Sequence, residues 1–278
     1  MDLLDALVMG IVQGLAEYLP ISSSGHLEIF REILGIDLNP SEALEFDVAL
    51  HVATVLSTIV VLWREFLPLC KSFFTFKRDE NFSYVCKILL SCIPVAIVGL
   101  CFKDFVEQFF GQDLSLVGVC LLVTAVLLSF AYYYGASPAV KNAVVRRKEH
   151  DITWLDAFVI GCSQAVAVIP GLSRSGTTIA TGLLLGDKRD KVAQFSFFMV
   201  IIPILGEALL DLKDMIGGES AAHEAVGLMP IAVGFIASFV VGCIACRWML
   251  DIVKKGKLIW FALYCVLAGA TCIGWSLC

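Results

Sequence analysis

Long apolar segments recur along this chain, and polar or charged residues separate them. Six of these segments lie at roughly 46–63, 85–102, 115–134, 193–212, 226–246 and 257–277. About 20 apolar residues in a helix cross a hydrocarbon core of about 30 Å, so each segment is predicted to be a transmembrane helix. The pattern therefore predicts an all-α, polytopic membrane protein.

Two further pairs of apolar segments are divided by polar turns. The first pair is 4–19 and 22–35, broken at Pro20, and the second is 156–169 and 173–186, broken at Pro170. The segment 4–19 would rise only about 24 Å as a helix, which is too short to cross the membrane. Irregular backbone at membrane depth is tolerated where protein or a wet cavity satisfies it. We therefore expect each pair to form a re-entrant hairpin that enters and leaves on one side.

The two hairpins are copies of one design. Aligned without a gap at an offset of 151, residues 4–35 and 155–186 share 12 identities in 32 positions. The identical pairs are Leu4/Leu155, Asp5/Asp156, Ala6/Ala157, Val8/Val159, Gly10/Gly161, Gln13/Gln164, Ala16/Ala167, Ser22/Ser173, Ser24/Ser175, Gly25/Gly176, Leu34/Leu185 and Gly35/Gly186. Each copy also carries three spans, an odd number, so the second copy must enter from the opposite face. We predict a single integral membrane domain over 1–278, with repeat one at 1–135 and repeat two at 152–278. This is an inverted-topology repeat whose hairpins meet near the midplane.

Composition and charge agree with this topology. The chain is 59% hydrophobic, with a mean hydropathy of +0.86, which excludes an ordinary soluble protein. The formal net charge of −6 hides a strong asymmetry, because the predicted topology places three basic residues on one face and sixteen on the other. The three are Arg31, Lys103 and Lys213; the sixteen are Arg64, Lys71, Lys77, Arg78, Lys87, Lys141, Arg146, Arg147, Lys148, Lys188, Arg189, Lys191, Arg247, Lys254, Lys255 and Lys257. By the positive-inside rule the basic face is cytoplasmic, which puts both termini and the mouth of the first hairpin outside.

Charged groups at membrane depth mark the candidate site. Glu17 and Arg174 each cost about 2.5–3.5 kcal/mol on insertion scales, so each is a functional candidate unless the two merely pair with each other. Gln13 lies one turn before Glu17 on the same helix face. Ser23 and His26 share a face at the start of the next half-helix.

The second hairpin supplies complementary groups. Its second half-helix opens at Ser173, Ser175 and Thr178, and free N–H groups at a helix start attract anions. Arg174 adds a planar cation suited to phosphate. The first copy alone carries the carboxylate, the hydroxyl and the imidazole. A nucleophile, a base, an orienting acid and a charge clamp are the parts of phosphoryl transfer.

These residues resemble the undecaprenyl-diphosphate phosphatase family of bacteria, which is associated with bacitracin resistance. The first hallmark, Glu/Gln-x-x-x-Glu followed by a histidine, reads here as Gln13 to Glu17 with His26. The second, Pro-Gly-x-Ser-Arg-Ser-x-x-Thr, is intact at 170–178. The resemblance covers nearly the full chain, including its length and the order of the spans.

The resemblance implies an enzyme of the bacterial inner membrane that removes the terminal phosphate of a C55 polyprenyl diphosphate and so recycles the lipid carrier of cell-wall synthesis. It implies a divalent cation, Mg²⁺ or Ca²⁺, held by Gln13 and Glu17. Ser23 matches the nucleophile, His26 the general base or acid, Glu17 the group that orients His26 or binds metal, and Arg174 the phosphate clamp. Which of Ser23 and His26 attacks phosphorus stays open. The expected phosphate-binding residues are Ser22, Ser24, Gly25, Ser173, Ser175, Gly176 and Thr178.

Other readings and partners follow from the same features. Gln13 stands where some family members have glutamate, which lowers the charge available to a metal. A secondary transporter or lipid flippase explains the inverted repeat but not the unequal copies. A phosphatidic-acid-phosphatase type shares Ser24-Gly25-His26 but needs a histidine where Ala180 stands. We expect the lipid substrate and membrane lipids as partners, expect no nucleic acid, and leave a homodimer open.

Overall fold

The computed structural model describes residues 1–102, 105, 108, 114–136, 149–216 and 226–277. Its named elements in these residues are all helices. Six stretches are long and apolar enough to cross a membrane: Ser41–Val61, Glu80–Cys101, Leu114–Tyr134, Arg189–Leu210, Leu228–Lys254 and Ile259–Ser276. The prediction of an all-α, polytopic membrane protein is thereby confirmed.

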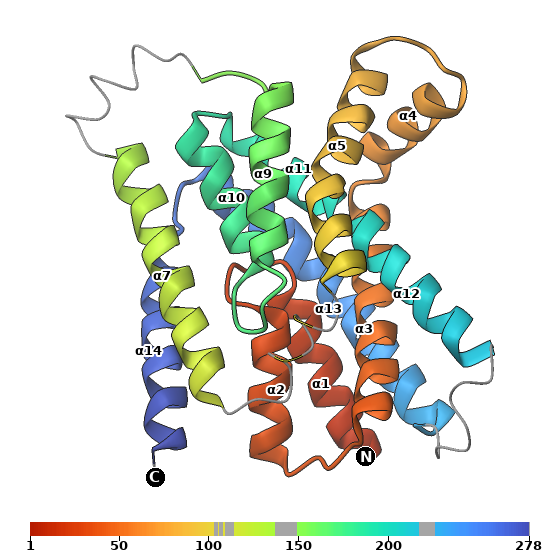
Figure 1. The fold of residues 1–278 in the computed structure, drawn as a ribbon, viewed down its shortest axis with the longest axis vertical. Coiled ribbons are helices and arrows are strands. Elements are labelled where there is room, and N and C mark those ends of the chain that lie inside the picture. The colour runs from red at the N-terminus through yellow and green to blue at the C-terminus, as the bar shows by residue number, and fades with distance from the viewer. Residues whose placement is uncertain (103–104, 106–107, 109–113, 137–148, 217–225, 278) are drawn as a thin grey trace.

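Two helical hairpins fill the centre of the molecule. The first is α1 (Leu3–Ala16) and α2 (Ser23–Leu34), and the second is α9 (Trp154–Val166) and α10 (Arg174–Leu185). In Figure 1 the first hairpin occupies the lower half of the bundle and the second the upper half, with their turns at mid-height. The hydroxyl of Ser175 donates to the carbonyl of Leu19 over 3.2 Å, so the turns are in direct contact.

The remaining helices surround these hairpins. They are α3 (Pro40–Val61), α4 (Trp63–Phe74), α5 (Glu80–Cys101), α7 (Leu114–Ala136), α11 (Arg189–Met199), α12 (Ile201–Ile216), α13 (Leu228–Lys254) and α14 (Ile259–Ser276). Helix α1 packs along α13, and α9 packs along α5. The first helix of each hairpin thus packs on the second span of the other repeat, which is α13 for α1 and α5 for α9. The last spans of the two repeats, α7 and α14, pack on each other.

One predicted span is two helices. The expected helix 193–212 is divided between α11 and α12 at Val200. Pro203 has no N–H and cannot bond to the carbonyl of Met199, one turn earlier. That carbonyl accepts a hydrogen bond from the thiol of Cys92 instead, at 3.4 Å. A neighbouring span therefore satisfies the group that the proline releases.

Two other boundaries differ from the prediction. Helix α13 continues to Lys254 rather than ending near 246. Helix α4 was not predicted, because it follows α3 after a single residue and is too short to span a bilayer. It is amphipathic, with Leu69 and Ser72 buried and Phe74 exposed.

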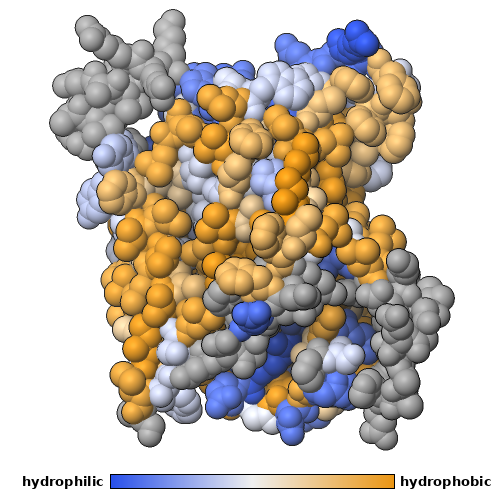
Figure 2. Space-filling model, viewed as in Figure 1, coloured by the Kyte–Doolittle hydropathy of each residue, from blue (hydrophilic) through white to orange (hydrophobic). Residues whose placement is uncertain are grey.

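The outer surface has the character of a membrane protein. Figure 2 shows hydrophobic side chains over most of the visible face, with hydrophilic ones gathered at the top and lower centre. Both chain termini lie at the lower end in Figure 1. Of the basic residues counted above, five lie outside the described residues: Lys103, Lys141, Arg146, Arg147 and Lys148.

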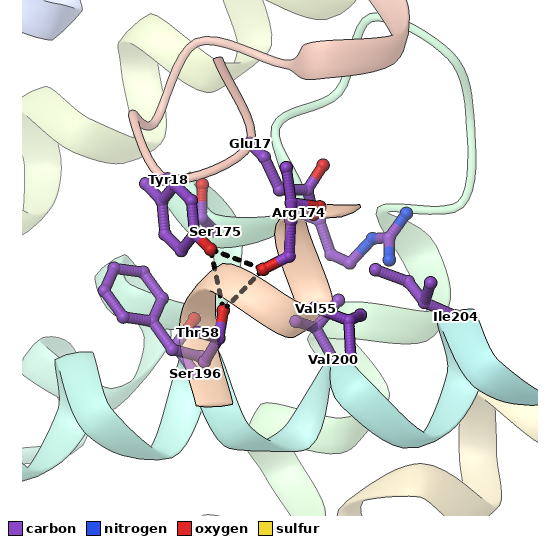
Figure 3. A pocket seen from close by; sticks show the side chains of 11 residues that line it. Glu17, Tyr18, Val55, Thr58, Arg174, Ser175, Ser196, Val200 and Ile204 are labelled. Carbon is purple, nitrogen blue, oxygen red and sulfur yellow. Dashed lines mark hydrogen bonds between the residues drawn. The ribbon is translucent and has the colours of Figure 1, made fainter. Parts of the chain in front are cut away.

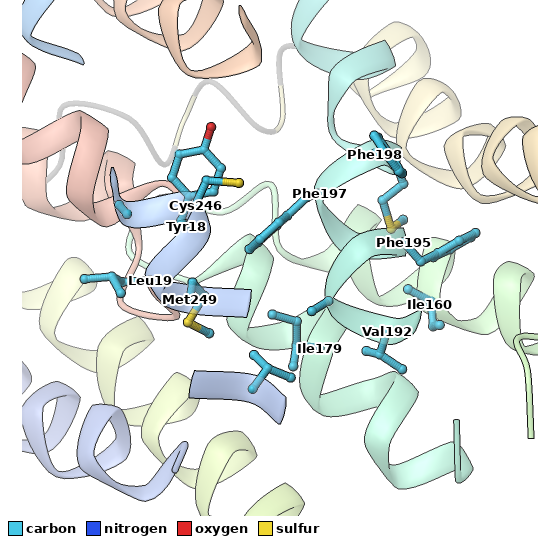
Figure 4. Close-up of a cluster of buried hydrophobic side chains, with 14 of the residues drawn as sticks. Tyr18, Leu19, Ile160, Ile179, Val192, Phe195, Phe197, Phe198, Cys246 and Met249 are labelled. Atoms are coloured by element: carbon cyan, nitrogen blue, oxygen red, sulfur yellow. The ribbon is translucent and has the colours of Figure 1, made fainter. Parts of the chain in front are cut away.

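The largest apolar cluster joins the two halves of the chain. Figure 4 shows Tyr18 and Leu19 from the first turn near Met249 of α13 and the phenylalanines of α11. The rings of Tyr18 and Phe197 meet edge to face at 5.2 Å between centroids. The polar turn of the first hairpin is therefore seated on side chains of the second copy.

Glycines allow the closest helix contacts, and this generates a prediction. A Cβ at Gly10 would lie 2.4 Å from the carbonyl oxygen of Gly234, and one at Gly161 would lie 2.4 Å from that of Ser91. Gly10→Ala and Gly161→Ala should each lower the free energy of unfolding by about 1–3 kcal/mol, because the facing backbone must move. Thermal unfolding in detergent measures the loss.

The matched controls are Gly99→Ala and Gly206→Ala. Both glycines are helical, and a Cβ there would meet nothing within 4 Å. Removing a helical glycine without a clash should raise stability by up to about 1 kcal/mol. Equal effects at all four positions would show that the packing contact does not matter.

Candidate active site

Glu17 is the centre of a polar cluster. It caps the C-terminal end of α1, and its side chain is only 8% exposed. Its Oε2 accepts hydrogen bonds from the Ser23 hydroxyl at 2.7 Å and from the Gln13 amide at 3.0 Å. The Nε2 atom of His51, from α3, lies 3.6 Å from the same oxygen. The carboxylate thus joins both helices of the first hairpin to a span.

Ser23 is presented by a strained turn. It is the first residue of α2, and the preceding residue, Ser22, has φ +71°. This is the left-handed region, which costs a non-glycine residue free energy and occurs often at functional sites. The Ser22 hydroxyl accepts from the N–H of Gly25 at 3.3 Å, so it caps the helix and holds the turn.

His26 lies apart from the carboxylate. Its Nδ1 is 2.8 Å from the carbonyl of Ser22, and its Nε2 is 2.6 Å from the hydroxyl of Tyr264 on α14. The two rings also stack, with centroids 5.6 Å apart. In the described residues Glu17 contacts Gln13, Ser23 and His51 and has no hydrogen bond to His26. Tyr264 holds the imidazole instead.

A pocket opens beside Glu17. It is small, and its empty volume of ≈ 370 Å³ includes the space at its open mouth. Arg174 and Ser175, at the start of α10, line it with Glu17, as Figure 3 shows. Within the described residues no carboxylate forms an ion pair with Arg174. Glu17 and Arg174 therefore line one pocket without a direct ion pair.

A hydroxyl network forms another wall of the pocket. Tyr18 O–H lies 2.6 Å from the carbonyl of Thr54, 2.5 Å from the Ser57 hydroxyl and 2.8 Å from the Thr58 hydroxyl. Dashed lines in Figure 3 mark the bonds to α3. The sequence analysis missed Tyr18 and Thr58, since a tyrosine or threonine inside apolar sequence is not by itself a functional signal.

Most of the expected phosphate-binding residues have structural contacts. Ser173 caps α10 by accepting from the N–H of Gly176 at 3.0 Å, as Ser22 caps α2. Thr178 bonds to the hydroxyl of Ser196 at 2.6 Å. Gly25 packs so closely that a Cβ would lie 2.9 Å from the Cα of Gly171.

Two serines remain from that set. Ser24 lies 3.4 Å from the hydroxyl of Ser22, which is a weak contact. Ser175 is the one member of the expected set that lines the pocket. The structure therefore brings Gln13, Glu17 and Ser23 together, and of these Glu17 lines the pocket with Arg174 and Ser175.

The fold and site define a class. A buried carboxylate that holds a serine hydroxyl, in one pocket with a guanidinium inside a bundle of apolar helices, is typical of an integral membrane protein equipped for phosphate chemistry.

Comparisons with known proteins narrow the class. The family described as bacitracin resistance protein BacA matches residues 6–271. A protein of Parabacteroides distasonis, named undecaprenyl-diphosphatase, is 54% identical over 277 residues, covering 100% of this chain and 99% of that protein. A protein of the same name from Bacteroides thetaiotaomicron is 52% identical over 273 residues, covering 98% of both chains. Another from Oceanobacillus iheyensis is 35% identical over 269 residues, covering 94% of this chain and 92% of that protein. The chain therefore belongs to the BacA family, as the resemblance in its motifs predicts, and it is a multi-pass membrane protein.

Proposed function

We propose that this protein hydrolyses undecaprenyl diphosphate to undecaprenyl phosphate and inorganic phosphate, which recycles the lipid carrier of cell-wall synthesis. The names of its relatives support the substrate. The observation that carries the chemistry is the 2.7 Å hydrogen bond from the Ser23 hydroxyl to Glu17 at the pocket. A hydroxyl bonded to a carboxylate is a nucleophile beside its base.

The reaction proceeds in two steps. The Ser23 oxygen attacks the terminal phosphorus, its proton passes to Glu17, and the bond to the bridging oxygen breaks so that undecaprenyl phosphate leaves. Water then attacks the phosphoserine, and inorganic phosphate leaves. His26 is not assigned the attack, because both of its ring nitrogens are engaged, with Ser22 and Tyr264.

Arg174 and the start of α10 bind the phosphates. The guanidinium matches phosphate oxygens in a bidentate manner and stabilises charge that develops in the transition state. Ser175 lies next to it in the pocket. His26, packed on Tyr264, supports the turn that presents Ser23.

Phosphate release by the purified protein in detergent tests this function. Ser23→Ala should lower kcat by about 10³-fold or more, since the nucleophile is lost. Arg174→Lys should lower kcat/KM by about 10²–10³-fold, because lysine cannot form the bidentate contact. Trapped phosphoserine at Ser23, found by mass spectrometry, would establish the covalent intermediate.

Thr271→Ala is the matched control for loss of a hydroxyl. Thr271 is exposed on α14 and bonds only to its own helix. Full activity of Ser23→Ala would remove Ser23 as the nucleophile. A wild-type protein that releases no phosphate but moves the lipid across vesicles would favour the transporter reading instead.

We further propose that Gln13 and Glu17 hold a divalent cation such as Mg²⁺ or Ca²⁺. The Oε1 atom of Gln13 is buried and accepts no hydrogen bond from a described residue, although the amide nitrogen is engaged with Glu17. Amide and carboxylate oxygens suit hard cations. Such an ion, when bound, would offset the negative charge of the diphosphate.

Gln13→Glu tests this assignment. A second carboxylate should strengthen cation binding, so the Mg²⁺ concentration for half-maximal activity should fall about tenfold. Calorimetric titration of Mg²⁺ without substrate gives a second readout. The control is Gln164→Glu, the equivalent position in the second copy, which should leave both values unchanged. If Gln13→Glu changes neither the Mg²⁺ concentration for half-maximal activity nor the calorimetric affinity, Gln13 is excluded as a ligand.

We infer that both termini and the mouth of the first hairpin face outward. The termini share one end of the bundle, and the positive-inside rule assigns the more basic end to the cytoplasm. The chemistry then takes place near the external leaflet of the bacterial cell membrane.

Epitope tags measure this orientation. A tag after residue 278 should react with antibody on intact spheroplasts, and a tag inserted after Lys77, between α4 and α5, should react only after permeabilisation. The reverse pattern would invert the assigned topology.

A further inference from the structure

Three metal-ligating side chains meet where the second hairpin begins and ends. His150 precedes α9, Asp156 lies in its first turn, and Asp187 follows α10. His150 Nδ1 is 3.2 Å from Asp187 Oδ1 and 3.7 Å from Asp156 Oδ2. One ligand atom from each residue lies within 4.8 Å of the others. Since α9 spans thirteen residues, or about 20 Å, the cluster is remote from the catalytic turn.

The equivalent position in the first copy is apolar. Both hairpins end in the same motif: the N–H of Ile36 bonds to the carbonyl of Arg31, and the N–H of Asp187 bonds to that of Gly182. The residue at this point in such a helix end commonly makes a hydrophobic contact. Ile36 does so, packed against an apolar cluster. The second copy carries a carboxylate in its place.

That carboxylate is buried, and its ion-pair partner among the described residues is the His150 imidazole. The Asp187 side chain is 0% exposed, and neither oxygen accepts a hydrogen bond from a described residue. A buried carboxylate without hydrogen bonds is costly unless a cation compensates it.

The charges in the cluster suit a divalent cation. The carboxylates of Asp156 and Asp187 both face the imidazole of His150, and two negative charges need two positive charges to balance them. Lys188 does not supply them, because its ammonium group pairs with Asp151 at 3.2 Å. A divalent ion with a neutral imidazole and two carboxylates leaves no net charge.

We propose that His150, Asp156 and Asp187 form a structural site for a Zn²⁺-like divalent metal ion. Ligands 2.0–2.2 Å from a tetrahedral ion lie about 3.3–3.6 Å apart. His150 Nδ1 lies at 3.2 and 3.7 Å from the two carboxylate oxygens, which is close to this range. The backbone supports one ligand, since the N–H of Thr153 donates to Asp156 Oδ2 at 2.8 Å. The carbonyl oxygen of Asp151, 3.1 Å from His150 Nδ1, is available as a fourth ligand. The ion would tie the start of α9 to the end of α10.

Thermal unfolding of the purified protein in detergent, after treatment with a chelator, tests the site. The measurement uses a Glu17→Gln background, which weakens cation binding at the proposed site of Gln13 and Glu17. Zn²⁺ at a hundredfold excess over its dissociation constant should raise the midpoint by about 5 °C or more. The same concentration of Mg²⁺ should give no comparable rise, because imidazole suits zinc better. Co²⁺ should produce the visible absorption of a tetrahedral complex.

Asp187→Asn and His150→Gln should each abolish the Zn²⁺ shift and the Co²⁺ spectrum. His150 is partly exposed, so its variant tests the site even if Asp187→Asn fails to fold. Asp190→Asn is the matched control, since it removes an exposed carboxylate in the first turn of α11 that is not part of the cluster, and it should keep the full shift. A wild-type protein without a Zn²⁺ shift, or variants that keep it, would overturn the proposal.

Discussion

The contact between the two central turns determines the rest of the structure. Each turn interrupts a helical hairpin at mid-height of the apolar bundle, where unpaired backbone groups are costly. The first turn is satisfied by the second, through Ser175 and the carbonyl of Leu19, and the second is satisfied by a span, since the N–H of Ser173 bonds to Thr124 at 3.1 Å. The cavity, the strained Ser22 and the placement of Arg174 all depend on these turns meeting.

The two hairpins share their backbone architecture but carry different chemical groups. Both keep the glycine of close helix contact, Gly10 and Gly161, and both keep a serine cap. They differ at the side chains that enter the pocket, because only one copy supplies Glu17 and only the other supplies Arg174. Shared positions therefore maintain backbone geometry, whereas unshared positions carry function.

Much of this could be predicted from the sequence. The length of the apolar segments predicted the six spans. The internal repeat predicted that the two hairpin turns meet, which brings Glu17 and Ser23 of the first turn near Arg174 of the second. The contacts of His51 and Tyr264 could not be predicted, since they join segments far apart in the chain. The break before Pro203 depends on the Cys92 thiol, which donates a hydrogen bond to the released carbonyl. Helix α4 was missed because it is amphipathic and too short for a search based on the length of apolar segments.

The mutual dependence of the turns has a consequence for biogenesis. The first turn is completed by Ser175, which lies 156 positions after Leu19 in the chain, and at about 5–20 residues per second the ribosome needs roughly 10–30 s to deliver it. During that interval the nascent first hairpin must shelter its polar backbone against the insertion machinery, a chaperone or the membrane surface. The fold is thus closed late in synthesis, and a ribosome that stalls midway would leave an orphaned half suited to quality-control proteolysis.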